Sequence, residues 1–194
     1  MNHYSAAIAI LAVALAVPGA AEPVRVSTHI EADSSKTLVH EAVVDGAIAD
    51  VWLAISTPQG WMSWAVPVAW ISPEDANVLE TSYDPADRPG SASTIQQQFV
   101  AKIPGRLLVF RTTKAPVGFP HWETYRRVTS IFELEAVGRQ TRVRLTSLGY
   151  PDTDAGAALV QFFEKGNAAS LENLQRRFQT GPGNGNGSGT VAHP

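Results

Sequence analysis

The feature that most constrains this chain is residues 152–179, whose pattern predicts one long amphipathic helix. Small or apolar residues recur every three or four positions and therefore share one face of such a helix: Leu159, Phe163, Gly166, Ser170, Leu174 and Phe178. Asp152 to Asp154 supply polar caps and negative charge at the start, and Gly181 with Pro182 ends the helix. A helix this one-sided needs a broad apolar surface to lie on.

The rest of the chain is predicted to be rich in strands, which could supply that surface. Short runs with period-two alternation are separated by turn residues, and the pattern is clear where Phe132 and Leu134 oppose Glu133. Strands at such short intervals indicate an antiparallel meander. The candidate strands are residues 24–30, 38–44, 68–71, 78–83, 93–103, 107–114, 122–136 and 140–148. Two short helices are predicted after the second of these strands, over residues 47–56 and 61–64.

Three stretches carry a resemblance to a known superfamily. They are VVDGAIADVW at residues 43–52, the tryptophan pair within residues 61–64, and FFEKGNA at residues 162–168, which continues to Phe178. With the element order, they resemble the START-like (SRPBCC) superfamily over about residues 37–179, in the branch related to the activator of heat-shock-protein-90 ATPase and to polyketide cyclase-like proteins. The resemblance implies an α+β helix-grip fold, in which a curved antiparallel sheet wraps a long C-terminal helix and two short helices follow the first long strand.

The two ends of the chain are predicted to lie outside the folded domain, which we place at residues 22–179. Residues 6–17 form an uncharged apolar run, which is shorter than the ~20 residues that span a bilayer and has the length of a signal-peptide core. Gly19 and Ala21 suit cleavage after Ala21, so we expect residues 1–21 to be a signal peptide and the protein to be periplasmic or secreted. The alternatives are an N-terminal membrane anchor or a buried strand. Residues 180–194 are expected to be a disordered Gly/Asn-rich tail.

Composition excludes several classes of function. The chain has no cysteine, which rules out disulfides, thiolate zinc sites and a cysteine nucleophile. Its formal net charge of -3 leaves no basic excess to hold a phosphate backbone, so we expect no nucleic-acid partner. His29 with Glu31 and His40 with Glu41 have no spacing that joins them into one metal site. We therefore expect neither a metal nor a cofactor.

The resemblance implies a cavity between the sheet and the C-terminal helix, which the superfamily commonly uses for apolar small molecules such as lipids, sterols and polyketides. Aromatic walls would favour an apolar ligand by about 25 cal/mol for each Å² buried. The candidate ligand-binding residues are Trp61, Trp64, Trp70, Phe110, Phe119, Trp122, Tyr125, Phe162 and Phe163. For any single aromatic residue, a place in the core is the simpler interpretation, and Trp61 with Trp64 is the strongest pair for the cavity mouth.

One short motif could carry acid–base chemistry. If residues 122–136 form a strand, then His121, Glu123 and Tyr125 share a face, and an imidazole beside a carboxylate can move a proton. The alternative is a partly exposed strand end after Phe119 and Pro120. The second half of the meander is also locally basic, and its arginines suggest either a solvated strand face or a contact with an anion or lipid headgroup. They are Arg126, Arg127, Arg139, Arg142 and Arg144.

Three functions are consistent with these patterns. The first, which we favour, is the binding of a small apolar ligand, lipid- or polyketide-like, by an exported protein with no stable membrane span after signal removal. The second is a cyclase- or dehydratase-type enzyme that uses His121, Glu123 or Tyr125. The third is a protein-interaction module of the chaperone-ATPase-activator type, for which the sequence names no protein partner.

Overall fold

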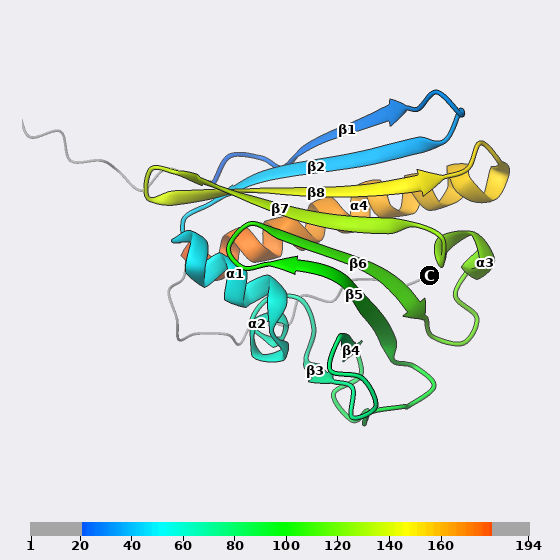
Figure 1. Cartoon of the computed structure of the whole chain (residues 1–194), viewed down its shortest axis with the longest axis horizontal. Coiled ribbons are helices and arrows are strands. Elements are labelled where there is room, and N and C mark those ends of the chain that lie inside the picture. The colour runs from blue at the N-terminus through cyan, green and yellow to red at the C-terminus, as the bar shows by residue number, and fades with distance from the viewer. Residues whose placement is uncertain (1–20, 180–194) are drawn as a thin grey trace, which may run out of the picture.

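The computed structural model describes residues 21–179, which form a single sheet with four helices (Figure 1). The strands are antiparallel and lie in the order β1-β2-β8-β7-β6-β5-β4-β3. In chain order the elements are β1 (Arg25–Ile30), β2 (Lys36–Val44), α1 (Ile48–Ser56), α2 (Pro58–Met62), β3 (Val68–Ile71), β4 (Val78–Ser82), β5 (Ile95–Ile103), β6 (Leu107–Lys114), α3 (Trp122–Tyr125), β7 (Thr129–Val137), β8 (Gln140–Tyr150) and α4 (Asp154–Gln179).

The long helix α4 lies across one face of the sheet, mainly against β2 and β8 (Figure 1). Its buried side chains Leu159, Leu171 and Leu174 are at most 2% exposed. They meet the apolar residues that alternate along the inner face of the strands, so the periodicities of helix and sheet match at the interface. The expected helix-grip fold of the α+β class is therefore confirmed.

Helices α1 and α2 pack into the same core as the second half of α4. The indole nitrogen of Trp61 donates to the carbonyl oxygen of Ile55 at 2.7 Å, and that of Trp64 donates to the carbonyl oxygen of Ala54 at 3.0 Å. These donors satisfy carbonyl groups at the end of α1, where no further helical turn can do so. The two rings lie 5.3 Å apart and hold α2 against α1.

The largest difference from the predicted elements is in residues 122–136. The prediction of one continuous strand is wrong, because the short helix α3 precedes β7, which begins only at Thr129. His121 takes a left-handed backbone conformation with φ of 54° at the residue just before α3. The second short helix also begins earlier than expected, at Pro58, where Thr57 caps it by accepting from the Gly60 amide at 3.0 Å.

The predicted signal peptide and tail lie almost wholly outside the described residues, at 1–20 and 180–194. Their assignment, the cleavage after Ala21 and the exported location remain predictions. Between residues 21 and 179, no helix combines the length and apolarity needed to cross a membrane.

Candidate ligand-binding site between the long helix and the sheet

The inner face of the sheet, which faces α4, carries polar side chains at positions where strand alternation predicts core residues. On β2 and β8, Leu38 lies opposite Ser147, and Ser147 lies opposite Ser130 of β7. His40, two residues along β2, is fully buried on the same face. A polar cluster at the centre of an otherwise apolar sheet is costly unless its members have partners.

Open space adjoins this polar cluster on the helix side. Gly166 lies in the middle of α4, and a Cβ built on it would have no atom within 4 Å. Ser130 is half-buried rather than buried, although it lies on the inner face of a central strand. Gln97 of β5 is half-buried in the same way. The helix therefore does not pack tightly onto β5 to β7, in contrast to its contact with β2 and β8.

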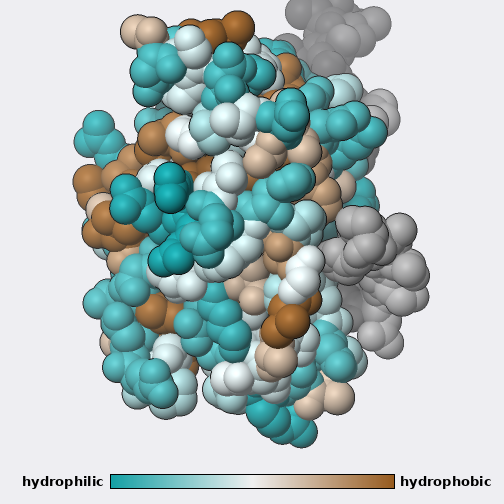
Figure 2. Space-filling view, turned by 90° about the vertical axis from the view of Figure 1, so that its right-hand side faces the viewer, coloured by the Kyte–Doolittle hydropathy of each residue, from teal (hydrophilic) through white to brown (hydrophobic). Residues whose placement is uncertain are grey.

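An aromatic cluster closes the end of this space where α3 meets the start of α4. Tyr125 stacks on Phe163 with ring centroids 4.5 Å apart, and Phe119 contacts Tyr125 at 5.2 Å. Phe162 and Trp122 complete the cluster through edge contacts. In Figure 2, which shows the end of the molecule that carries α3, hydrophobic residues lie scattered among hydrophilic ones. Phe162 remains 37% exposed, so this end of the space is bounded by side chains that water can reach.

The buried imidazole of His40 bridges the sheet and α4. Its Nε2 atom lies 2.9 Å from the carbonyl oxygen of Glu164. Because a carbonyl oxygen only accepts, the neutral ring carries its proton on Nε2 and leaves Nδ1 as a bare acceptor. Nδ1 is buried and has no partner among residues 21–179. Burial lowers the pKa of His40, and the contact with Glu164 only partly offsets this effect, so the neutral form is favoured.

Two tyrosine hydroxyls lie near the same part of the sheet. Burial raises the pKa of both Tyr125 and Tyr150, so both phenols stay protonated at neutral pH. The Tyr125 hydroxyl accepts from the Thr112 hydroxyl at 3.3 Å. Tyr150 is fully buried, and its hydroxyl has no hydrogen-bond partner of good geometry among the described residues, although Ser147 lies close.

The structure divides the nine expected ligand-binding aromatics between separate places. Five of them form the aromatic cluster at the α3 end: Phe119, Trp122, Tyr125, Phe162 and Phe163. Phe110 lies in the core of β6 and stacks on Phe132 at 5.9 Å. Trp61 and Trp64 pack in the α1–α2 core with their indole donors occupied. Trp70 lies on β3, opposite Glu80 of β4.

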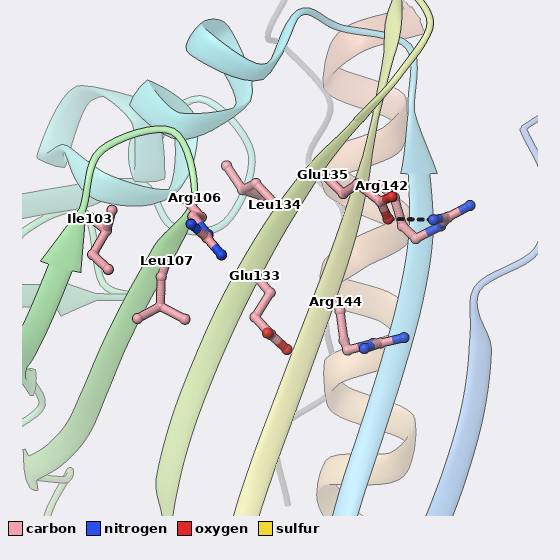
Figure 3. Close-up of a pocket in the computed structure, with 8 residues that line it drawn as sticks. All are labelled: Ile103, Arg106, Leu107, Glu133, Leu134, Glu135, Arg142 and Arg144. Carbon is pink, nitrogen blue, oxygen red and sulfur yellow. Dashed lines mark hydrogen bonds and ion pairs between the residues drawn. The ribbon is translucent and has the colours of Figure 1, made fainter.

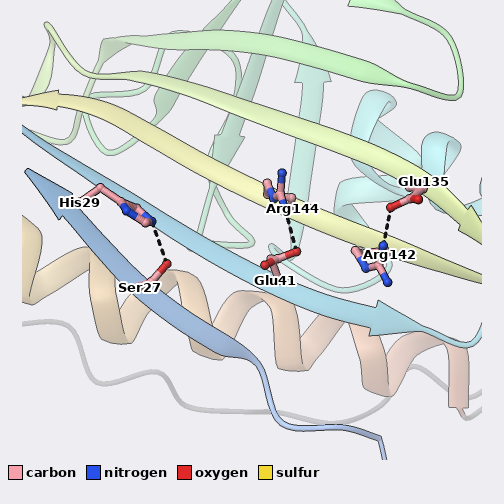
Figure 4. Close-up of polar contacts among 6 residues, drawn as sticks. All are labelled: Ser27, His29, Glu41, Glu135, Arg142 and Arg144. Carbon is pink, nitrogen blue, oxygen red and sulfur yellow. Dashed lines mark hydrogen bonds and ion pairs between the residues drawn. The ribbon is translucent and has the colours of Figure 1, made fainter. Parts of the chain in front are cut away.

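The three catalytic candidates are not brought together. His121 and Glu123 are exposed, and Glu123 of α3 pairs with Arg126 at 3.4 Å. The ring of Tyr125 instead points inward onto Phe163. The expected shared strand face does not exist, because Glu123 and Tyr125 are helical and His121 is the left-handed residue before the helix. His29 is also remote from the cluster: it lies on the exposed edge strand β1 beside Ser27 (Figure 4).

Sequence reasoning missed the polar residues that lie on the inner face of the sheet. His40 was noted only as part of a metal pattern, and Ser130, Ser147 and Tyr150 were not singled out. The available signal was a polar residue in phase with apolar neighbours, as in Leu38-x-His40-x-Ala42 on β2. Such a residue either has a specific partner or lines a site.

The outer face of the sheet has a hollow of about 530 Å³ between the β5–β6 hairpin and β7–β8 (Figure 3). Its charges are largely compensated, because Arg142 pairs with Glu135 and Arg144 pairs with Glu41 (Figure 4). Arg127 and Arg139 are exposed and lie on other segments. This arrangement fits a solvated strand face better than an anion site. Within residues 21–179, no three His, Asp or Glu side chains gather as metal ligands do.

Comparisons with known proteins agree with this architecture. A model of the family described as "Polyketide cyclase / dehydrase and lipid transport" matches residues 35–179. The chain belongs to this family. The START-like (SRPBCC) resemblance is thereby confirmed. No curated protein sequence matches the chain.

Solved structures share the fold at low sequence identity. A protein from Arthrobacter aurescens has 16% identity and a TM-score of 0.62, and the match covers 87% of this chain and 98% of that one. The Aha1 dimer from Colwellia psychrerythraea has 18% identity and a TM-score of 0.56, and the match covers 76% of this chain and 98% of that one. CalU16 from Micromonospora echinospora has 15% identity and a TM-score of 0.53, and the match covers 88% of this chain and 81% of that one. At these identities, the likeness shows the shared fold.

Proposed function

We propose that the chain binds a small, mainly apolar molecule between α4 and the inner face of the sheet. The observation that carries this proposal is the open space at Gly166 of α4, together with Ser130 and Gln97, which are only half-buried on the inner face of the sheet. The family description, which includes lipid transport, supports the same assignment. Apolar walls with a few convergent polar groups are the usual composition of a small-molecule site.

Export fits this function as a further proposal. The apolar run at residues 6–17 and the small residues before Glu22 are those of a cleaved signal peptide. A lipophilic ligand outside the cytoplasm needs a carrier, because its apolar surface is costly to expose to water. N-terminal sequencing of protein recovered from the periplasm or medium should begin at Glu22. A mature protein that retains residues 1–21 would contradict export by cleavage.

The binding proposal is tested by filling the space beside Gly166 with a larger side chain. A Gly166→Leu variant places a side chain in the open volume, where its Cβ would meet no atom within 4 Å, so we expect it to fold normally. The matched control is Ala158→Leu, which adds the same bulk at an exposed position of the same helix. Native mass spectrometry should find a bound lipophile, or uptake of an added apolar fluorescent dye, in the wild type and Ala158→Leu only. A wild-type protein that never carries or takes up such a molecule would overturn the proposal.

A further inference from the structure

Three buried polar side-chain atoms on the inner face of the sheet have no hydrogen-bond partner among residues 21–179, and their chemistry restricts what a ligand can be. They are Nδ1 of His40, the hydroxyl of Tyr150 and Oε1 of Gln97, of which the last can only accept; His40 and Tyr150 are 0% exposed. A buried polar atom without a hydrogen bond costs about 1–3 kcal/mol, so a fold retains one when something else satisfies it. His40 contacts the main chain of α4 at Glu164, one helical turn or less from Gly166, so the unpartnered Nδ1 lies in the layer between β2 and the same part of the helix.

The direction of hydrogen bonding at His40 is fixed. Its Nε2–H donates to the Glu164 carbonyl, which cannot donate in return. Nδ1 therefore requires a hydrogen-bond donor from a ligand. The Tyr150 hydroxyl can both donate and accept, so it adapts to an oxygen of either kind. A ligand hydroxyl satisfies either atom, whereas a carboxylate or phosphate, which only accepts, leaves Nδ1 unpaired.

The charges of the described residues also argue against an anionic ligand. Among residues 21–179, no lysine or arginine is buried. Two half-buried lysines are already engaged: Lys36 of β2 pairs with Asp152 at 3.7 Å, and Lys114 is held by Ser91 and Thr94 in the β4–β5 connection. An anionic headgroup in this space would be desolvated without a buried cation to pair with, which is strongly unfavourable.

We infer that the site selects neutral, hydroxyl-bearing lipophiles, such as long-chain or cyclic alcohols, over fatty acids and phospholipids. The ligand hydroxyl donates to Nδ1 of His40, while the apolar body lies against the aromatic cluster and Phe110. This inference rests on the proposed binding function and narrows its ligand class.

The test compares three probes of equal chain length: dodecanol, dodecyl methyl ether and dodecanoate. At pH 7.5, displacement of an apolar dye from the wild type should rank the alcohol first, by roughly fivefold or more over the ether, since one hydrogen bond contributes about 1 kcal/mol. Dodecanoate should bind most weakly. His40→Phe should bind the alcohol and the ether equally, and Gly166→Leu should bind none of the three.

A second measurement is made on the wild type and therefore does not depend on whether a variant folds. The ¹⁵N resonance of His40 Nδ1 should move from that of a bare ring nitrogen to that of a hydrogen-bonded one with dodecanol, and stay unchanged with the ether. Equal binding of the three probes, or tightest binding of dodecanoate, would overturn the inference while leaving the binding function intact. If no probe binds the wild type, both the inference and the binding function fail.

Discussion

The side-chain amide of Gln175 donates to the main-chain oxygen of Val43 at 3.0 Å and to that of Glu22 at 2.9 Å. One residue of α4 thereby fixes the last half of the helix to β2 and to the segment that precedes β1. Gln175 is only 4% exposed, so its two bonds form away from water. The helix is thus tied to the sheet on the β1–β2 side, and the open space lies on the other side.

Replacement of Gln175 by Leu should lower the free energy of unfolding by about 1–3 kcal/mol, because two carbonyl groups lose a donor in a buried setting. Urea denaturation followed by circular dichroism measures this change. The matched control is Gln161→Leu, at an exposed position of the same helix. Equal stability of the two variants would contradict the assigned role of Gln175.

Glycine-to-alanine substitutions should change the free energy of unfolding in opposite directions in α2 and α4. A Cβ at Gly60 in α2 would overlap the carbonyl oxygen of Leu53, so Gly60→Ala should destabilise the fold by 1 kcal/mol or more, on the order of other overpacking changes. A Cβ at Gly166 meets open space, and Ala is the better helix former, so Gly166→Ala should stabilise by about 0.5–1 kcal/mol. The melting temperature should fall for Gly60→Ala and rise for Gly166→Ala relative to the wild type. A destabilising Gly166→Ala would mean that the space beside α4 is filled.

Stability should depend on pH through His40. Burial lowers its pKa in the folded state from the ordinary value of 6.5, so the unfolded chain binds a proton more readily as pH falls. Stability from this group is fully present above pH 6.5 and decreases as pH falls through that value toward the folded-state pKa. The wild type should therefore lose stability between pH 7.5 and 5.5 more steeply than His40→Phe. Parallel pH profiles for the two proteins would rule out a buried neutral His40.

The local stability of the β4–β5 connection should depend on Lys114. Its ammonium group donates to the carbonyl oxygen of Ser91 at 2.6 Å and to the Thr94 hydroxyl at 2.8 Å. The buried Glu80 holds the same loop by accepting from Thr94 at 2.5 Å and from the Gly90 amide at 2.6 Å. Lys114→Met should speed hydrogen exchange in residues 84–94 severalfold, while the exchange of β7 and β8 stays unchanged. Lys165→Met, at an exposed position of α4, is the matched control. Unaltered exchange in the loop would contradict this role.

The fold could be predicted from the sequence because its periodicities are strong. The spacing from Leu159 to Phe178 predicted α4, and the alternation around Phe132 predicted the two-sided sheet. The segment at residues 122–136 could not be predicted in the same way, since Trp122 to Tyr125 suit a strand as well as a helix. In the structure, the helix follows the left-handed His121 and turns the ring of Tyr125 onto Phe163 of α4, a contact that the local sequence does not reveal.

The site was harder to predict than the fold, because its polar members come from strands that are distant in sequence. His40 and Glu164 are 124 residues apart and meet only through the packing of α4 on β2. The aromatic residues were visible in the sequence, yet their pattern does not separate Trp61, which packs in the α1–α2 core, from Phe163, which belongs to the aromatic cluster at the α3 end.

The most direct test of a guest between α4 and the sheet is a chemical-shift titration of the ¹⁵N-labelled protein with dodecanol. The amides of Gly166, Ser130 and Ser147 should shift together and saturate at one ligand per chain, while those around Arg142 and Arg144 stay in place. Shifts confined to the outer face of the sheet, or no saturable shift at all, would contradict the account.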